Sequence, residues 1–364
     1  MKFVCSKNDL NEAISTVQKA VMAKATLPIL EGIYIEAKEK VRLIGNSFDL
    51  GIEYSINGDI MEEGSIVLNS KIFGDIIRKL PDSEVFFEVK DNFNTIIECG
   101  NSYFEIKGMA SGGFPMLPEI EEEKKVNIPQ VLLKEMIKKT LYAISTDENR
   151  KILTGSLIEV KDGEFTMVSL DGFRLAIAMV LIKEDVEFDA VIPGKNLNEI
   201  HKILEQTEDE IKITLSENQA LFEMNGCRIL SKLLNGEYMN YRNFIPEQFE
   251  TVITVDTKEL ISSIERASLI TNDDKRYPVK FAITDEKLMI TSSAEIGISK
   301  EELDVEIDGG NMTISFNPRY LLDSLKVIDE EKIKLSFSSS IGPSVIKPVE
   351  GERFIFMVLP VRVK

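Results

Sequence analysis

Apolar residues recur at helical spacing in six segments of this chain. In the first segment Leu10, Ile14, Val17 and Val21 lie three or four residues apart, which places their side chains on one face of a helix. The same spacing predicts two helices in each third of the sequence, at residues 6–24, 70–80, 129–144, 194–204, 256–270 and 318–326. Apolar faces of this kind must be buried, so each helix is expected to pack against a sheet.

Short runs of β-branched and aromatic residues between the helices indicate strands. The clearest predicted strands span residues 33–37, 83–89, 156–160, 210–215, 280–284 and 332–337. Two dipeptides between such runs, Asn57-Gly58 and Asp162-Gly163, have the residues that tight hairpin turns need, because Asn, Asp and Gly tolerate positive φ. We therefore predict a hairpin turn at each of them.

The opening of the second helix occurs three times at a constant interval. Segments that begin at residues 69, 193 and 317 read NSKIF, PGKNL and NPRYL, and an apolar helical stripe follows each. This interval is the length of a domain rather than of a solenoid unit. A charged run at 119–125 is typical of a solvated linker. The sequence therefore predicts an α+β fold of three repeated domains, 1–125, 126–248 and 249–364, each with two helices packed on antiparallel sheets.

Composition is that of an ordinary globular protein. Hydrophobic residues make up 43% of the chain, and no apolar run approaches the roughly 20 residues that span a bilayer. The first residues lack the apolar core of a secretory signal. Cys5, Cys99 and Cys227 are scattered, which suggests reduced thiols. Together these features predict a cytoplasmic protein that does not enter a membrane.

The net charge of −18 argues at first against a nucleic-acid partner, because phosphates repel an acidic surface. The charge is unevenly distributed, however. The six predicted helices together carry a net positive charge, so the remaining residues are even more acidic than the whole. This pattern fits either a basic surface for phosphates or a chance excess of Lys on helix surfaces, and charge alone leaves both readings open.

Residues for catalysis do not form a recognisable constellation in the sequence. His201 is the only histidine, so neither a histidine zinc cluster nor a triad with an obvious partner can form. Phosphate-binding glycine loops of the two common types are missing from the sequence. A non-catalytic role is favoured. A carboxylate-dependent nuclease or transferase, and a repeat scaffold unrelated to DNA, remain alternatives.

Three segments resemble the family of bacterial DNA polymerase sliding clamps, the β subunits of the DNA polymerase III holoenzyme. They are residues 24–30 (KATLPIL), 170–176 (LDGFRLA) and 357–364 (MVLPVRVK), and the resemblance runs from Met1 to Lys364. It implies a non-catalytic homodimer whose domains assemble head-to-tail into a ring around duplex DNA, with helices facing the hole and no cofactor or metal. The implied partners are duplex DNA, the replicative DNA polymerase, the clamp loader and other clamp-binding repair proteins.

The resemblance also implies DNA-binding and dimer-interface residues. Basic positions expected to contact DNA are Lys24, Arg150, Lys151 and Lys195, although each could be an ordinary solvated side chain. The dimer interface is expected at Phe104 and Ile106 of the first repeat and at Leu269 and Ile270 of the third. Unpaired strand edges invite such pairing. The alternative is that Ile106 and Leu269 pack within their own domains.

A partner-peptide pocket is implied between the second and third repeats. Its expected residues are Leu153, Leu170, Gly172, Phe173, Arg174, Leu175, Met239, Asn243, Phe244, Asn317, Tyr320, Ile341, Pro343, Met357, Val358, Leu359, Pro360, Val361 and Arg362. For Leu153, Leu175 and Val358, a place in the core is a strong alternative. Leu170, Phe173 and Val361 stand where the family often has Thr, His and Met, so the cleft is expected to be more apolar than is usual.

Overall fold

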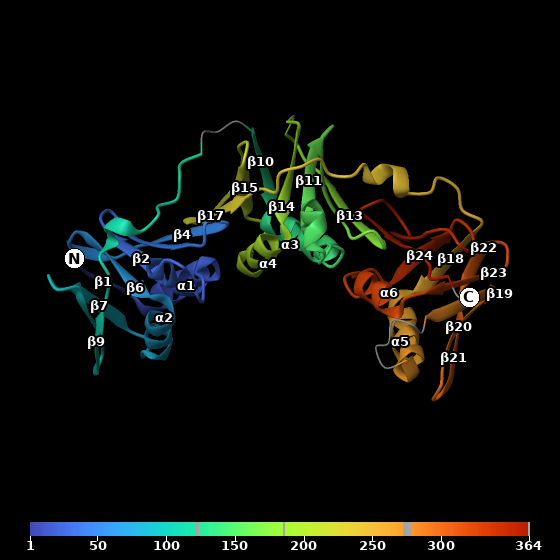
Figure 1. Cartoon of the computed structure of the whole chain (residues 1–364), viewed down its shortest axis with the longest axis horizontal. Helices are drawn as coiled ribbons and strands as arrows, with labels where there is room; N and C mark the ends of the chain where they lie inside the picture. The colour runs from blue at the N-terminus through green and yellow to red at the C-terminus, as the bar shows by residue number, and fades with distance from the viewer. Residues whose placement is uncertain (121–123, 185, 272–277, 363–364) are drawn as a thin grey trace. The chain divides into compact units, whose positions relative to one another are not determined.

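The computed structural model describes residues 1–120, 124–184, 186–271 and 278–362. The chain forms two compact parts (Figure 1). The first part comprises Met1–Gln130 and Lys202–Leu233, and the second comprises Val131–His201 and Leu234–Lys364. The middle third of the sequence therefore contributes to both parts, and each part contains its own sheets.

All six predicted helices are present. They are α1 (Lys7–Val17), α2 (Ser70–Lys79), α3 (Gln130–Leu141), α4 (Gly194–Ile203), α5 (Thr257–Ser268) and α6 (Pro318–Leu325). The first predicted helix was too long, because α1 ends at Val17 and only a 3-10 turn follows it, over Gln18–Ala20. Lys24 therefore lies outside the helix, and α1 itself contains more acidic than basic residues.

Polar side chains at the strand-to-helix transitions explain why several helices begin where they do. Asn69 Oδ1 accepts a hydrogen bond from the Ile72 amide at 3.1 Å before α2. Asn317 Oδ1 accepts one from the Arg319 amide at 3.0 Å before α6. Such side chains satisfy amide groups that the first helical turn leaves without partners. The repeated Asn in the sequence motif is therefore a helix cap.

Two antiparallel sheets form the first part. The larger sheet has the strand order β10-β15-β16-β17-β4-β3-β2-β6, and the smaller has the order β5-β1-β7-β8-β9. Their bounds are β1 Lys2–Ser6, β2 Gly32–Ala37, β3 Val41–Asn46, β4 Leu50–Ile56, β5 Asp59–Glu62, β6 Gly64–Asn69, β7 Glu84–Val89, β8 Asn94–Cys99, β9 Ser102–Lys107, β10 Lys124–Pro129, β15 Glu210–Leu215, β16 Gln219–Met224 and β17 Cys227–Lys232.

The second part also has two antiparallel sheets, with the orders β14-β11-β12-β13-β26-β25-β24-β18-β22 and β21-β20-β19-β23. Their bounds are β11 Gly155–Lys161, β12 Glu164–Leu170, β13 Arg174–Leu181, β14 Phe188–Pro193, β18 Thr251–Asp256, β19 Val279–Thr284, β20 Lys287–Ala294, β21 Gly297–Asp304, β22 Glu306–Gly309, β23 Met312–Phe316, β24 Lys332–Phe337, β25 Ser344–Pro348 and β26 Phe354–Val358. The predicted α+β class with antiparallel sheets is confirmed.

Of the two predicted hairpin turns, one is confirmed and one is wrong. Asp162 and Gly163 join β11 to β12 with φ values of 51° and 75°. Asn57-Gly58, in contrast, lies where the chain leaves one sheet for the other, because β4 pairs with β3 whereas β5 pairs with β1. Gly58 allows a close approach, since a Cβ there would lie 3.1 Å from the Val4 carbonyl oxygen.

Each large sheet continues from one sequence repeat into the next. In the first part, β17 of the second repeat pairs with β4 of the first, joining residues 227–231 to 50–54. In the second part, β26 of the third repeat pairs with β13 of the second, joining 354–358 to 174–178. The small sheets end in edge strands β9 and β21. Strand pairing therefore links successive repeats.

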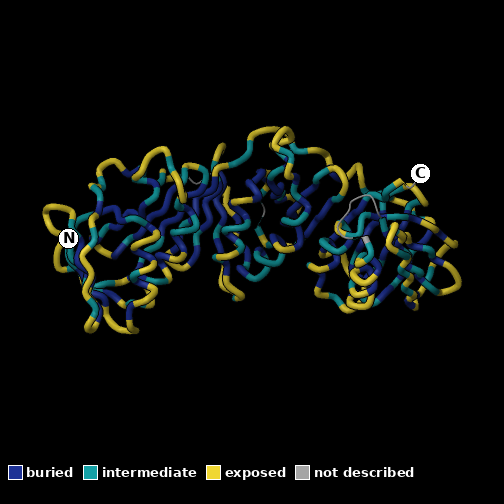
Figure 2. The backbone as a smooth tube through the Cα atoms, turned by 60° about the horizontal axis from the view of Figure 1, so that its bottom comes forward, coloured by how far each residue is buried: buried dark blue, intermediate teal, exposed yellow. Residues whose placement is uncertain are grey.

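The helices bury their predicted apolar faces against these sheets. α1 packs against α2 and β4, and α5 packs against α6, β20 and β21. Leu10 and Ile14 of α1 are buried, as are Leu260 and Ile264 of α5. Figure 2 shows buried residues mainly in the interior of each part and exposed residues mainly at its periphery. None of the helices in the described part of the chain has the length and apolar character needed to span a bilayer.

Candidate functional site

A cavity of about 710 Å³ lies in the second part, lined by the 144–150 loop, the β12–β13 loop and the N-terminal half of α6. It brings together five residues that the sequence placed in functional sites, namely Arg150, Phe173, Arg174, Asn317 and Tyr320. Arg150 was assigned to DNA contact and the other four to the peptide pocket. The structure thus places one predicted DNA-binding residue in the lining of the predicted pocket.

Arg174 is held rigidly in this lining. Its Nε lies 3.0 Å from Asp171 Oδ2 and its Nη1 lies 2.5 Å from Asp323 Oδ2. The guanidinium also lies over the Tyr320 ring, 4.8 Å from the ring centroid. Burial opposes the charge, but the bonds to Asp323 and Asp171 outweigh it and raise the pKa of Arg174 above its usual value. Arg174 is therefore a fixed cation.

The β12–β13 loop presents Phe173 to the cavity through a tight local turn. Asp171 Oδ1 accepts hydrogen bonds from the amides of Phe173 at 2.8 Å and of Arg174 at 3.0 Å. Gly172 has φ +94°, and a Cβ there would lie 3.0 Å from Arg150 Nη1. The Phe173 ring stacks on Tyr320 with centroids 5.9 Å apart and remains 55% exposed. The Asp-Gly pair in the motif thus shapes the loop that exposes Phe173.

The segment after β26 completes this region. Its Leu359 amide donates to the Phe173 carbonyl at 2.8 Å, and its Val361 amide donates to the Ser315 carbonyl at 2.8 Å. The segment therefore runs between the β12–β13 loop and the end of β23. Asn317 follows β23 directly, and its cap on α6 fixes its orientation. Leu359, Pro360 and Val361 are half-buried and Arg362 is exposed.

Beneath this surface lies an apolar cluster. Leu153, Leu170, Leu175 and Met357 are buried in it, and Leu359 packs against it from the surface. Leu153 and Leu175 are only 2% and 1% exposed, so in this chain they are core residues that support the surface. Val358 is fully buried in a different cluster. For these three predicted pocket residues, the core position is the one observed.

The segment 238–245 borders the same cluster and is anchored by polar contacts. Tyr238 Oη donates to the Val168 carbonyl at 3.3 Å. Arg242 Nη2 lies 2.7 Å from Glu159 Oε2, to which Tyr241 Oη also donates at 2.9 Å. The anchoring leaves three predicted pocket residues exposed, namely Met239, Asn243 and Phe244.

Fifteen of the nineteen predicted pocket residues do not line this cavity, and two of them lie on a separate loop. Ile341 and Pro343 belong to the loop between β24 and β25, and Ile341 is 68% exposed. Sequence reasoning also missed residues that position Arg174. Asp171 is signalled by its place in the LDGFRLA motif, whereas Asp323 and Tyr142 carry no signal at sequence level because only folding brings them to Arg174.

The predicted DNA-binding residues are all exposed. Lys24 lies in the first part, and Arg150, Lys151 and Lys195 lie in the second. Arg150 Nε also pairs with Asp147 Oδ2 at 3.2 Å. α2, α3 and α4 each contain more basic than acidic residues. Lys139 of α3 is buried, however, so the helix surface is less basic than its sequence suggests.

Two of the predicted interface residues lie on the edge strand β9, and the other two lie in the 3-10 turn that follows α5. Phe104 is exposed and Ile106 half-buried on edge strand β9. Leu269 is 72% exposed directly after α5, and Ile270 is half-buried. Three further apolar residues, Tyr103, Ile296 and Ile298, are exposed on or beside edge strands β9 and β21, and the sequence analysis missed them. Alternation of Ile296 and Ile298 before and within β21 was a signal that could have found them.

Models of one protein family match nearly the whole chain. They are described as the N-terminal domain of the DNA polymerase III beta subunit at residues 1–118, its central domain at 127–240 and its C-terminal domain at 242–362. The beta sliding clamp of Bacillus subtilis (strain 168) is 38% identical over 376 residues, covering 100% of each chain. That of Halalkalibacterium halodurans is 36% identical over 378 residues, again covering 100% of each.

Solved structures agree with these matches. The crystal structure of a DNA polymerase sliding clamp from Bacillus subtilis superposes with a TM-score of 0.96 at 37% identity and covers 100% of each chain. A putative DNA polymerase III beta subunit from Eubacterium rectale gives a TM-score of 0.96 at 36% identity, also over 100% of each chain.

Proposed function

Because the chain belongs to the family of DNA polymerase III beta subunits, the bacterial sliding clamps, we propose that it is the processivity factor of a replicative polymerase. In this role it acts in the cytoplasm as a non-catalytic homodimeric ring around duplex DNA. It slides along the duplex and tethers the polymerase, the clamp loader and repair proteins. Its three domains correspond to the predicted boundaries 1–125, 126–248 and 249–364.

Strand pairing between repeats is the observation that carries this proposal. Both junctions inside the chain have the same form, because the last strand of one repeat pairs antiparallel with the fourth strand of the preceding repeat. Thus β17 pairs with β4, and β26 pairs with β13. β9 is the last strand of the first repeat, and β21 is the counterpart of β4 and β13 in the third. Both are edge strands within the described residues.

In a dimer of this chain, both edge strands of each copy would gain a pairing partner. β9 of one copy would pair with β21 of its partner, and the same contact would form again on the other side of a two-fold axis, which closes a ring. Unpaired edges of this kind are a hazard for a monomer. Exposed apolar side chains accompany both edges, including Phe104 and Tyr103 on β9 and Leu269 and Ile298 near β21.

Weak, dispersed phosphate contacts suit a ring that slides. Contacts to phosphate carry no sequence information directly, and a closed ring is retained by topology rather than by tight binding. The exposed basic residues Lys24, Arg150, Lys151 and Lys195 would make such contacts. The acidic remainder of the chain, with a net charge of −18 overall, would discourage DNA from binding elsewhere.

The second part supplies the tether. Phe173, Tyr320 and Leu359 offer apolar surface, while Arg174 and Asn317 are fixed polar groups beside it. Buried apolar surface contributes about 25 cal/mol per Å², and a few oriented polar groups define the register of a bound peptide. This combination fits a short partner peptide with apolar and amide side chains.

Retention on circular DNA tests the ring directly. The protein is loaded with a bacterial clamp loader onto a nicked circular plasmid, and the DNA is isolated by gel filtration. We expect the protein to stay with the circle and to be lost when the plasmid is linearised at a single site. Equal loss from circular and linear DNA would contradict encirclement, and an intrinsic nuclease activity would favour the enzyme alternative.

A further inference from the structure

The cavity at Phe173 contains charged side chains of both signs. Its charged lining residues are Asp147, Arg150, Asp171, Arg174, Arg319, Asp323 and Lys326. Arg174 contacts two of the three carboxylates, Asp171 and Asp323. The third carboxylate, Asp147, accepts a hydrogen bond from Arg150 Nε at 3.2 Å. Every carboxylate of the lining therefore already has a cationic partner from the lining itself.

Of the two remaining cations of the lining, one is paired and one is not. Lys326 Nζ lies 2.7 Å from Glu265 Oε1 of α5. The Arg319 guanidinium, in contrast, forms no ion pair with a carboxylate in the described ranges of the chain. Arg319 is also exposed. It is thus the lining cation whose charge the described residues leave uncompensated.

The position of Arg319 on α6 explains why it stays without an ion pair. Asp323 is four residues further along the helix, at a spacing where side chains are neighbours and commonly pair. Asp323 Oδ2 instead lies 2.5 Å from Arg174 Nη1. The Arg319 amide donates to Asn317 Oδ1 at 3.0 Å, so this cap fixes the backbone from which the guanidinium extends. The Arg174–Asp323 contact therefore leaves Arg319 free to bind another carboxylate.

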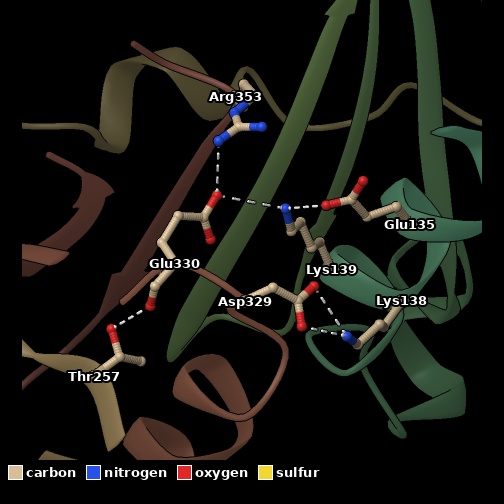
Figure 3. A network of polar contacts seen from close by, with 7 residues as sticks. All are labelled: Glu135, Lys138, Lys139, Thr257, Asp329, Glu330 and Arg353. Carbon is tan, nitrogen blue, oxygen red and sulfur yellow. Dashed lines mark hydrogen bonds and ion pairs between the residues drawn. The ribbon is translucent and has the colours of Figure 1, made fainter. Parts of the chain in front are cut away.

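Cations that hold the fold of the second part together are paired, as Figure 3 shows for a separate network. Lys138 Nζ lies 3.1 Å from Asp329 Oδ1. Lys139 and Arg353 lie 4.0 Å and 3.3 Å from Glu330. These contacts join α3 to the segment before β24 and to the turn before β26. Arg319 makes no such link, so its charge is available for a ligand.

Arg319 lies next to the aromatic surface of the cavity. Tyr320, the following residue, stacks on Phe173 with ring centroids 5.9 Å apart. A guanidinium is planar and holds a carboxylate through two parallel hydrogen bonds. A ligand that contacts the rings and Arg319 together would carry both apolar side chains and a carboxylate. An Asp or Glu within an apolar peptide supplies this combination.

Nucleic acid fits this lining less well than such a peptide does. A strand of DNA or RNA brings several phosphates into a site, and carboxylates repel phosphates. Asp147, Asp171 and Asp323 lie in the same lining as Arg319. A peptide with a single acidic residue places its carboxylate at Arg319 and its apolar side chains elsewhere. The charge distribution therefore favours a peptide.

We propose that Arg319 is a specificity-determining residue of this cavity, and that it pairs with an Asp or Glu carboxylate of the partner peptide. The inference rests on the proposed role of the cavity as the peptide pocket. The apolar side chains of the peptide contact Phe173 and Tyr320, and its acidic residue lies beside the start of α6. Partner peptides with an acidic residue in reach of Arg319 bind more tightly than their neutral counterparts.

Isothermal titration calorimetry with neutral and acidic peptides tests the proposal on the full chain. The neutral parent is acetyl-Gly-Gln-Leu-Ser-Leu-Phe-Gly-amide, and its three acidic versions carry Asp in place of the first Gly, the Ser or the last Gly. We expect at least one acidic version to bind about two- to fivefold more tightly than the parent, as suits a solvent-exposed ion pair. This gain should disappear in Arg319→Gln, persist in part in Arg319→Lys and decrease as the salt concentration rises.

The controls separate the role of Arg319 from that of the pocket. Arg353→Gln removes an exposed arginine that does not line the cavity, and it should leave the gain unchanged. The neutral parent should bind to the wild type and be lost in Phe173→Ala. If the parent binds but no acidic version gains affinity, or if the gain survives in Arg319→Gln, the inference is wrong while the pocket stands.

Two further outcomes would overturn the inference in other ways. If the parent does not bind at all, the pocket assignment is wrong and the role of Arg319 falls with it. If Arg319→Gln leaves the peptide gain unchanged but lowers the salt dependence of DNA binding, Arg319 contacts a phosphate instead. Circular dichroism checks that each variant is folded.

Discussion

The two junctions where a sheet passes from one repeat to the next have the same backbone but different side chains. At the β17–β4 junction of the first part, charged residues alternate across neighbouring strands. Arg42 lies 2.8 Å from Glu36 and 3.6 Å from Glu53, and Glu53 in turn lies 4.0 Å from Arg228. Arg228 and Lys212 both pair with Glu223 at 3.4 Å.

The β13–β26 junction of the second part is mainly apolar. Ile177 pairs with Ile355 across the strands, and Ala176 pairs with Phe356. All four are buried, and they divide between two clusters on opposite faces of the sheet. The comparison teaches that antiparallel strand pairing is enough to join two repeats, whereas the side chains at the junction can be either charged or apolar.

The largest effect on stability is expected when a large side chain is removed from the apolar junction. Phe356 is fully buried, stacks on Phe354 at 4.7 Å and meets Tyr142 edge-on at 5.7 Å. Phe356→Ala should lower the free energy of unfolding of the second part by about 3–5 kcal/mol, because a cavity replaces the ring. Hydrogen exchange followed by mass spectrometry should show faster exchange in β13 and β26. Equal acceleration in β4 and β17 would contradict independent junctions.

A smaller effect is expected from breaking the charged junction. Glu53 is 8% exposed and lies between Arg42 and Arg228. Glu53→Gln should lower the free energy of unfolding of the first part by about 1–3 kcal/mol, because two guanidinium groups lose their shared carboxylate. Raising the salt concentration should weaken the wild-type first part but change Glu53→Gln less. Urea unfolding at low and high salt measures both, and identical salt dependence would show that the charged residues contribute nothing.

The segment that borders each junction should respond differently to acid, because only residues 238–245 are held by an ionised carboxylate. Burial acts to raise the pKa of Glu159, but hydrogen bonds from Arg242 and Tyr241 outweigh it and hold that pKa below its usual value. The resulting stability is present above the ordinary carboxyl pKa of about 4.3 and is lost as the pH falls through the lower folded value. In the first part, residues 114–118 are held instead by a neutral hydrogen bond, which Asn46 Nδ2 donates to the Pro115 carbonyl at 2.8 Å.

Hydrogen exchange as a function of pH detects this difference. Residues 238–245 should exchange faster below about pH 4 relative to residues 114–118, after correction for intrinsic rates. Arg242→Gln should remove the pH dependence without affecting the first part. If both segments loosen together on acidification, the Glu159 contact is not what anchors the second one.

Local patterns in the sequence predicted the elements well, and long-range contacts set the limits. Apolar spacing located all six helices, and Asp162-Gly163 formed its hairpin. The prediction at Asn57-Gly58 was wrong because the same dipeptide also occurs where the chain passes from one sheet to another. The dipeptide does not indicate whether the next strand pairs with the preceding one. At the site, Phe173 and Arg174 were found from their motif, but Asp323 reaches Arg174 only through folding. Burial of Leu153 and Leu175 likewise depends on neighbours that no local pattern contains.

The smallest effect concerns how the two parts share DNA contact. Lys24 belongs to the first part and Lys195 to the second, and both are exposed. Lys24→Ala and Lys195→Ala should each weaken DNA binding only a few-fold and reduce the slope of log affinity against log salt by about 1, because each lysine neutralises about one phosphate. The double variant should lose about twice that slope and load less well onto DNA. Fluorescence anisotropy across a salt series measures all three slopes, with the exposed Lys38→Ala as the control. If the salt slope is unchanged in only one of the two single variants, DNA contact is assigned to the part that contains the other lysine. If it is unchanged in both, neither lysine belongs to the DNA-binding surface.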